Sequence, residues 1–300
     1  MTPEPLIRRI RVIVNPKSGF GASIGVVVSA VEAAWQKTGA EITYELSHDQ
    51  ADSRKKIQLA IQDRVNLVLV AGGDGMINTV GRELMGTDVA MGVLPCGSGN
   101  GFARHFGIPL QADKAAEALF GGKIKAIDVG VINDHPFFVT CGLAWDAALV
   151  RSFERSPVRG ILPYVFAGMY ELFDYTPCRF RVRVDGGDWE EMEDPMVFTM
   201  ANLTQFGGGA RIAPSAKEDD GFLELVVVTR AHAAKAAAAL PRLFAGTIDQ
   251  APFVNTRRFR SLEVRREIAG VIQLDGELMP ATDQVRVQVR PEALRVLMPR

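Results

Sequence analysis

The strongest constraint on the fold is a strand–helix alternation in the first 120 residues, where each apolar run ends in turn residues. Residues 66–71, with the sequence NLVLVA, lead directly into Gly72, Gly73, Asp74 and Gly75. Short apolar runs of this kind are typical of strands that a parallel sheet buries on both faces. The pattern predicts strands at 10–14, 41–46, 66–71 and 91–94 and helices at 24–37, 52–62, 77–84 and 113–120. Because parallel neighbours need a crossover connection, this order predicts a doubly wound α/β sheet.

After Lys125 the pattern changes to short strands separated by Gly, Asp and Pro turns. Strands are predicted at 127–132, 137–141, 179–184, 196–201, 223–228, 261–264, 271–274 and 285–289. Helical spacing interrupts them within part of 148–173 and at 231–244. A series of short strands is typical of an antiparallel β-sandwich, so we expect a domain boundary near 121–126.

Composition narrows the function classes. With 34 Lys and Arg against 35 Asp and Glu, the net charge of −1 disfavours a protein that coats nucleic acid. Three scattered cysteines favour a reducing compartment, and the polar N-terminus lacks the apolar region of a secretory signal. The apolar stretch 160–173 contains Pro163 and Glu171 and is shorter than the roughly 20 residues of a spanning helix. We therefore expect a cytoplasmic protein that meets a membrane only from its surface.

Two glycine-rich loops, at 72–78 and 97–101, each follow a predicted strand and precede a helix. A third loop at 15–19 follows the first strand. In an open parallel sheet the carboxyl ends of the strands face the ligand, and glycine lets backbone N–H groups approach a phosphate. Asp74 beside phosphates indicates Mg²⁺, which cancels the charge repulsion. Single loops of this kind are more often ordinary turns, but three at one sheet edge favour a nucleotide site.

Two further segments carry carboxylates. Asp275 and Glu277 lie in LDGE at 274–277, which alone indicates a β-hairpin turn because Asp-Gly favours such turns. The acidic stretch at 218–220 follows Lys217. Taken by itself, it indicates only acidic side chains that are exposed to solvent. The four histidines lack HxxxH spacing and no GxSxG occurs, which disfavours a zinc site and an α/β-hydrolase.

Six motifs taken together resemble one family. They are NPKSG at 15–19, GGDGMIN at 72–78, PCGSGNGFAR at 95–104, GGGARIAP at 207–214, DDGFLEL at 219–225 and LDGE at 274–277. Their order resembles the diacylglycerol kinase catalytic-domain superfamily, which includes bacterial diacylglycerol kinase-like, sphingosine and ceramide kinases. The resemblance implies an α/β ATP-binding domain at 1–125 and a β-sandwich lipid-substrate domain at 126–300. It also implies ATP in the cleft between the domains and a C-terminal segment that packs back on the first domain.

The resemblance also implies roles for particular residues. Asp275 or Glu277 would accept the proton of a lipid hydroxyl as it attacks the γ-phosphate of ATP, and the motif does not decide between them. Asp220, with backbone groups of Lys217 and Phe222, would hold one Mg²⁺, and Asp74 would organise a second, catalytic Mg²⁺ through water. The nucleotide contacts would be Asn15, Lys17, Ser47, Gly72, Gly73, Asp74, Gly75, Met76, Ile77, Asn78, Gly97, Ser98 and Asn100.

Departures from the family pattern bear on the substrate. Met76 stands where the family commonly has Thr, and Ser98 and Gly101 stand where it has Thr and Asp. The GSGN form resembles the sphingosine-kinase-like branch, so the resemblance implies an acceptor that is either diacylglycerol or a sphingoid- or ceramide-type lipid. In that branch a carboxylate comparable to Asp146 is associated with the lipid head group, so Asp146 is a candidate substrate contact. An equal alternative is that Asp146 is an acidic residue at the N-terminus of a helix, where the helix dipole favours a negative charge.

Membrane contact would be transient. The stretch 160–173 would line a lipid pocket or lie on the membrane, with a core helix as the plainer alternative. The arginines within 257–266 would meet anionic lipid or simply cover strand faces. Two other functions remain open: an NAD kinase-like enzyme, because GGDG is shared with NAD kinases, and a catalytically weak nucleotide- or lipid-binding protein. We also allow for a homodimer.

Overall fold

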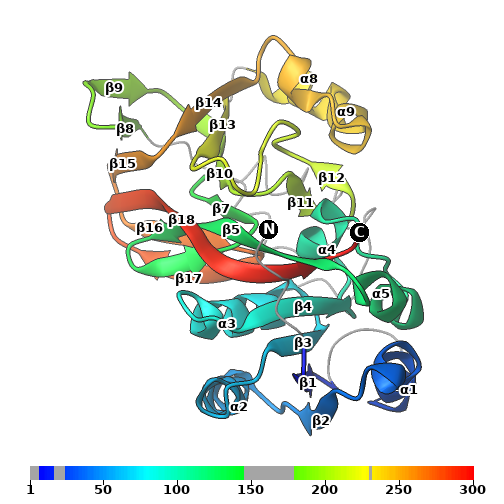
Figure 1. Cartoon of the computed structure of the whole chain (residues 1–300). Helices are drawn as coiled ribbons and strands as arrows, with labels where there is room; N and C mark the ends of the chain where they lie inside the picture. The colour runs from blue at the N-terminus through cyan, green and yellow to red at the C-terminus, as the bar shows by residue number, and fades with distance from the viewer. Residues whose placement is uncertain (1–6, 17–23, 145–178, 230–231) are drawn as a thin grey trace. The chain divides into compact units, whose positions relative to one another are not determined.

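The computed structural model describes residues 7–16, 24–144, 179–229 and 232–300, which divide into two compact units (Figure 1). The first unit runs to Ile127 and also contains Glu292–Arg300. The second unit is Asp128–Pro291. The α/β first unit and the β-sandwich second unit confirm the predicted fold class. The predicted helix within 148–173 lies outside the described residues.

The first unit is built on a parallel sheet. Its strands are β1 (Arg9–Val14), β2 (Glu41–Leu46), β3 (Leu67–Gly72) and β4 (Ala90–Pro95), in the order β2-β1-β3-β4. The end of β18 (Gln284–Met298) adds a further parallel neighbour, with Val296 opposite Met91. Strands β3 and β4 are buried along their whole length, as expected for the centre of a sheet covered on both faces.

Helices cover both faces of this sheet. Helix α2 packs against α3 on one face, and α1 packs against α5 on the other (Figure 1). The bounds are α1 Ile24–Trp35, η1 Gln36–Thr38, α2 Gln50–Gln62, α3 Asp74–Leu84, α4 Gly101–His105 and α5 Ala112–Leu119. Helix α3 begins at Asp74, earlier than the predicted 77, because Gly73 is its N-cap and the glycine loop forms its first turn.

The second unit contains an antiparallel sheet in the order β14-β13-β10-β7-β16-β17. Opposite it, β18 pairs with β15, β15 with β8 and β8 with β9, while β5 pairs with β6 and β18. The bounds are β5 Lys123–Ile132, β6 His135–Phe137, β7 Thr140–Gly142, β8 Phe180–Val184, β9 Trp189–Met192, β10 Pro195–Ala201, β13 Leu223–Thr229, β14 Asn255–Phe259, β15 Ser261–Arg266, β16 Gly270–Leu274 and β17 Glu277–Ala281.

The core of the second unit lies between these two layers of strands. Phe198 and Phe259 from one layer and Phe180 and Leu262 from the other belong to the same buried cluster. A second cluster, which includes Met196 and Val226, packs on the opposite face of the six-stranded sheet. The remaining elements are β11 Gln205–Gly207, β12 Ala210–Arg211, α8 Ala233–Ala238, α9 Leu240–Ala245 and η3 Ile248–Gln250.

The strands that the sequence pattern misses are edge strands. Strands β9, β14 and β17 each lie at the end of a sheet order, and most of their residues are not buried. Edge strands carry charged residues and proline, so they lack the alternation that reveals a strand. The predicted strand 137–141 is interrupted between β6 and β7. The predicted helix 231–244 is divided into α8 and α9, where Pro241 follows the start of α9.

Candidate functional site

The carboxyl ends of the first unit's parallel strands are joined by hydrogen bonds between their loops. Ser47 N donates to Val14 O at 2.8 Å, and Asn15 N donates to Ala71 O at 3.0 Å. Cys96 N donates to Gly72 O at 2.9 Å. These bonds bring the loops after β1, β2, β3 and β4 to one edge of the sheet, as the sequence predicts. Lys17 and Asp146 lie outside the described residues.

The two predicted glycine loops touch each other. A Cβ on Gly97 would lie 2.7 Å from the Gly73 Cα, and a Cβ on Gly73 would lie 3.2 Å from the Gly97 Cα. A Cβ on Gly72 would lie 2.9 Å from the Met76 Cβ. At Gly97 the backbone of the other loop leaves no room for a Cβ, at Gly73 the approach is tight, and at Gly72 the obstacle is the Met76 side chain. Gly73 and Gly97 are therefore favoured by the contact between the loops and not by turn conformation alone.

Asp74 ties the first glycine loop to the second. Its carboxylate accepts hydrogen bonds from Gly101 N at 3.1 Å and Phe102 N at 3.3 Å, the first residues of α4. Desolvation raises the pKa of Asp74, and the backbone N–H donors oppose that rise. Asn100, in the left-handed region, closes the second loop: Gly97 N donates to its Oδ1 at 2.9 Å, and its Nδ2 donates to Gly97 O at 2.7 Å.

The other residues of the first loop differ in how far their side chains are buried. Met76 and Ile77 are buried, so their side chains serve packing and only their backbone can meet a ligand. Asn78 is half-buried one turn further along α3. Thr79 is buried and donates its hydroxyl to Gly75 O at 3.1 Å.

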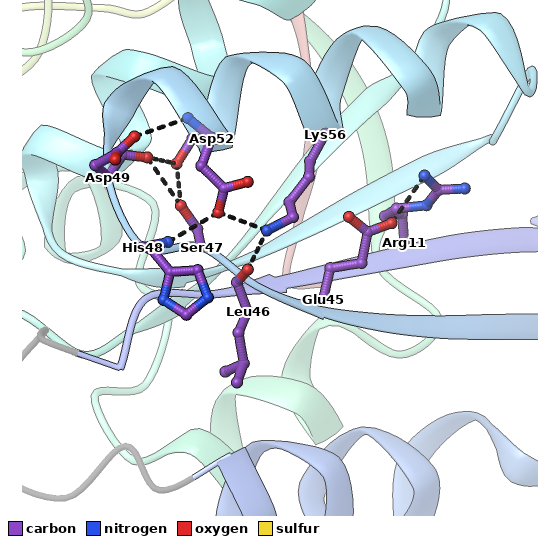
Figure 2. Close-up of polar contacts among 9 residues, drawn as sticks. Arg11, Glu45, Leu46, Ser47, His48, Asp49, Asp52 and Lys56 are labelled. Atoms are coloured by element: carbon purple, nitrogen blue, oxygen red, sulfur yellow. Dashed lines mark hydrogen bonds and ion pairs between the residues drawn. The ribbon is translucent and has the colours of Figure 1, made fainter.

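Ser47 is engaged in the start of α2, as Figure 2 shows. Its hydroxyl is bonded to the Ser53 hydroxyl and donates to Asp49 O at 3.1 Å. Asp49 is the N-cap and accepts from Asp52 N at 2.8 Å. Hydrogen bonds from Lys56 and from His48 N hold the pKa of Asp52 below its ordinary value. The Ser47 hydroxyl therefore supports the helix that follows β2.

In the second unit, Asp275 and Gly276 form the turn of the β16–β17 hairpin. Both residues have positive φ, and Leu274 is paired with Glu277 across the turn. This is the hairpin that Asp-Gly alone predicts. The two candidate carboxylates differ in environment: Asp275 is buried, whereas Glu277 is exposed.

The Asp275 carboxylate binds three backbone N–H groups. Oδ2 accepts from Phe138 N at 2.8 Å, and Oδ1 accepts from Val139 N at 2.7 Å and Thr140 N at 3.1 Å. Phe138 and Val139 lie between β6 and β7, and Thr140 is the first residue of β7, so Asp275 takes donors that a continuous strand would have used. The contact explains why the predicted strand 137–141 is interrupted.

Asp220 lies in the turn before β13. Its Oδ1 accepts from Phe222 N at 3.1 Å, and its Oδ2 is paired with the Arg258 guanidinium. Arg258 Nε also lies 3.6 Å from Glu224 Oε1. Burial raises the pKa of Glu224, and the Arg258 charge opposes that rise. Lys217 is exposed and Phe222 is half-buried.

The chemistry of the Asp220 turn suits a hard cation, because carboxylate and backbone carbonyl oxygens are what Mg²⁺ prefers. No group of three or more His, Cys, Asp or Glu side chains within the described ranges could hold a metal. A cation held by these ranges would therefore depend on backbone carbonyls and water as well as on a carboxylate.

Two buried residues that the sequence reasoning missed organise this part of the second unit. Asp128 Oδ2 accepts from Gly221 N at 2.6 Å, and Asp128 N donates to Glu218 O at 2.7 Å. Asn202 Nδ2 donates to Asp128 O at 2.9 Å and to Phe138 O at 3.0 Å. Asn202 thus connects the segment bound by Asp275 with the turn that contains Asp220. Neither residue belongs to a recognisable motif.

The basic run within 257–266 makes contacts inside the protein. Arg257 pairs with Glu190 at 2.8 Å, and Arg265 lies 4.5 Å from the centroid of the Trp189 ring. Arg266 is buried and donates to Thr282 O at 2.7 Å. Contact of these arginines with anionic lipid stays a prediction. Among the helices that the structure describes, none is both long and apolar enough to cross a bilayer.

Comparison with known proteins matches both units. Residues 9–132 match the diacylglycerol kinase catalytic domain, and residues 139–298 match the YegS C-terminal NAD kinase beta sandwich-like domain. A diacylglycerol kinase of Mycobacterium tuberculosis is 30% identical over 305 residues, covering 98% of this chain and 96% of the relative. A Citrobacter koseri protein named "Probable lipid kinase YegS-like" is 28% identical over 270 residues, covering 87% of each chain.

A crystal structure of a diacylglycerol kinase from Bacillus anthracis has the same fold. Its TM-score is 0.74 at 18% identity, and the match covers 97% of each chain. The two family models together cover most of the chain, and one relative is 30% identical along nearly its whole length. Both findings indicate the same family as the ordered motifs. The chain belongs to the diacylglycerol kinase catalytic-domain family and carries a C-terminal domain of the YegS type.

Proposed function

We propose that this member of the lipid kinase family transfers the γ-phosphate of ATP to a hydroxyl of diacylglycerol or of a sphingoid- or ceramide-type lipid. The observation that carries the proposal is the direct contact of the two glycine loops at the carboxyl edge of the parallel sheet. Bare backbone at such an edge offers N–H donors to phosphate groups.

The nucleotide-binding part of the proposal concerns the first unit. The backbone of Gly72, Gly73 and Gly75 and of Gly97 would bind phosphate oxygens. Asn15, Lys17, Ser98 and Asn100 would complete the contacts. Ser47 would act through the start of α2, because its hydroxyl is engaged by Ser53 and Asp49.

The acid–base part of the proposal concerns the second unit. Both Asp275 oxygens already bind backbone N–H groups, and the residue is buried. Glu277 is exposed two residues away, at the start of β17. We therefore assign Glu277 as the base that accepts the lipid hydroxyl proton while the hydroxyl oxygen bonds to the γ-phosphorus and ADP leaves. Asp275 would hold the hairpin that presents it.

The proposal includes Mg²⁺, which when bound would neutralise charge on the phosphate oxygens. Asp74 would orient water ligands of one ion while it fixes the second glycine loop. Asp220, with the carbonyls of Lys217 and Phe222, would hold another ion.

Gly97→Ala is expected to weaken ATP binding at least about tenfold, a loss of about 1.4 kcal/mol. The added methyl group would lie 2.7 Å from the Gly73 Cα and force the two loops apart. Calorimetric titration with ATP measures the effect. Gly187→Ala is the matched control, because a Cβ there would meet only Val184 O at 3.2 Å in a turn of the other unit. Equal affinity in wild type and Gly97→Ala would argue against this nucleotide site.

Phosphoryl transfer from labelled ATP to a panel of diacylglycerol, sphingosine and ceramide tests the function itself. We expect label on at least one lipid and none on NAD⁺. Transfer to NAD⁺ alone would identify the NAD kinase-like alternative. ATP binding without transfer to any lipid would identify the catalytically weak binding protein.

Cytoplasmic location, transient membrane contact and a homodimer belong to the same proposal. A lipid acceptor requires contact with a membrane surface, and the exposed arginines of the 257–266 run and residues 160–173 are the segments that would supply it. We expect co-sedimentation with anionic vesicles that high salt reverses. Co-sedimentation that is absent at low salt would contradict the membrane contact.

A further inference from the structure

Arg258 is fixed over the turn that contains Asp220 by the register of two strands. Strand β13 begins at Leu223, directly after the turn, and pairs antiparallel with β14 so that Glu224 lies opposite Arg258. From this position the Arg258 guanidinium pairs with the Asp220 carboxylate and lies 3.6 Å from Glu224. The guanidinium carbon is also 4.3 Å from the centroid of the Phe222 ring, where a cation is attracted by the ring face.

The rest of the turn is held without Arg258. Gly221 N donates to Asp128 Oδ2, and Phe222 N donates to Asp220 Oδ1. Arg260 approaches Phe222 as well, with its guanidinium carbon 4.4 Å from the ring centroid. The turn can therefore keep its backbone shape while the cation beside Asp220 is exchanged.

A guanidinium and a divalent cation cannot both occupy the same side of one carboxylate, because the two positive charges repel each other. The Arg258 side chain is 49% exposed. It can therefore move into solvent when another cation binds Asp220.

We propose that Arg258 and a divalent cation compete for the Asp220 carboxylate, with Arg258 serving as the counter-ion of the turn in the metal-free protein. Arg258 thereby lowers the affinity of the turn for the cation and makes the stability of the second unit largely independent of it. The inference rests on the cation site proposed at Asp220 and does not depend on which lipid is phosphorylated.

Mn²⁺ binding to the full chain, followed by electron paramagnetic resonance, tests the competition without any activity assay. Arg258→Gln removes the charge and keeps a side chain that packs on Phe222. Arg257→Gln is the matched control, since it removes the same charge at the neighbouring position, where the partner is Glu190. We expect Arg258→Gln to bind Mn²⁺ at least about tenfold more tightly than wild type, and the control to match wild type. Adding Asp220→Asn to Arg258→Gln should abolish the gain.

Thermal unfolding gives an independent readout. Wild type is expected to unfold at nearly the same temperature in EDTA and in Mg²⁺. Arg258→Gln should unfold several degrees lower in EDTA and regain the difference in Mg²⁺. Equal or weaker Mn²⁺ binding by Arg258→Gln, or a gain that survives Asp220→Asn, would overturn the proposal. A wild-type chain that loses as much stability in EDTA as the variant would overturn it too.

Discussion

Glu277→Gln is expected to reduce phosphoryl transfer to lipid by about 10²–10⁴-fold while the protein folds normally. The carboxylate is assigned as the base that takes the hydroxyl proton, and general-base catalysis contributes effects of this size. Because Glu277 is exposed at the start of β17, an isosteric amide should change the unfolding temperature by no more than about 1 °C. Steady-state transfer assays and thermal unfolding of the same preparation measure the two quantities.

Asp275→Asn is the informative comparison for Glu277→Gln. An amide retains one acceptor oxygen but turns an NH₂ group toward a backbone N–H that Asp275 now accepts. An unsatisfied buried donor costs about 1–3 kcal/mol, so we expect the unfolding temperature to fall by roughly 2–10 °C. Normal stability of Asp275→Asn would contradict its structural role. Full activity of Glu277→Gln, with Asp275→Asn inactive yet stable, would transfer the role of base to Asp275.

Asp74→Asn is expected to lower the turnover number at least about 10²-fold, the second large effect. The carboxylate holds Gly101 N and Phe102 N and is the proposed organiser of the catalytic Mg²⁺. The amide loses the negative charge and leaves one of these donors without an acceptor. A fall in unfolding temperature of a few degrees should accompany the loss of activity.

Asp113→Asn is the matched control for Asp74→Asn. It also removes a carboxylate from the first turn of a helix in the first unit, but Asp113 is exposed in α5. The control should keep its activity within about twofold, as expected of an exposed position. Turnover by Asp74→Asn at the rate of this control would refute the role assigned to Asp74.

The sequence predicts the parts of the fold that follow from hydrophobic pattern and turn chemistry. Strand β2 and the end of α3 occur where the pattern places them, and the Asp275 turn is a hairpin. Ordered motifs identify the family, and glycines after successive strands predict loops at one sheet edge. These predictions need only short stretches of sequence, because the residues within a loop largely determine its shape.

Long-range side-chain contacts could not be predicted in the same way. Asp275 binds Phe138, 137 residues away, and Asn202 joins Asp128 to Phe138. Arg258 reaches Asp220 only because of the β13–β14 register, and β14 is an edge strand with no alternation to reveal it. Such contacts depend on tertiary packing that a single sequence does not display.

Mass spectrometry of phosphorylated lipids, after incubation of the purified chain with ATP, Mg²⁺ and a total lipid extract, tests the central claim most directly. The account predicts a new phosphate ester of a diacylglycerol or of a sphingoid- or ceramide-type lipid, strongly reduced with Glu277→Gln. An extract in which no lipid gains a phosphate, with a wild-type chain that binds ATP, would contradict it.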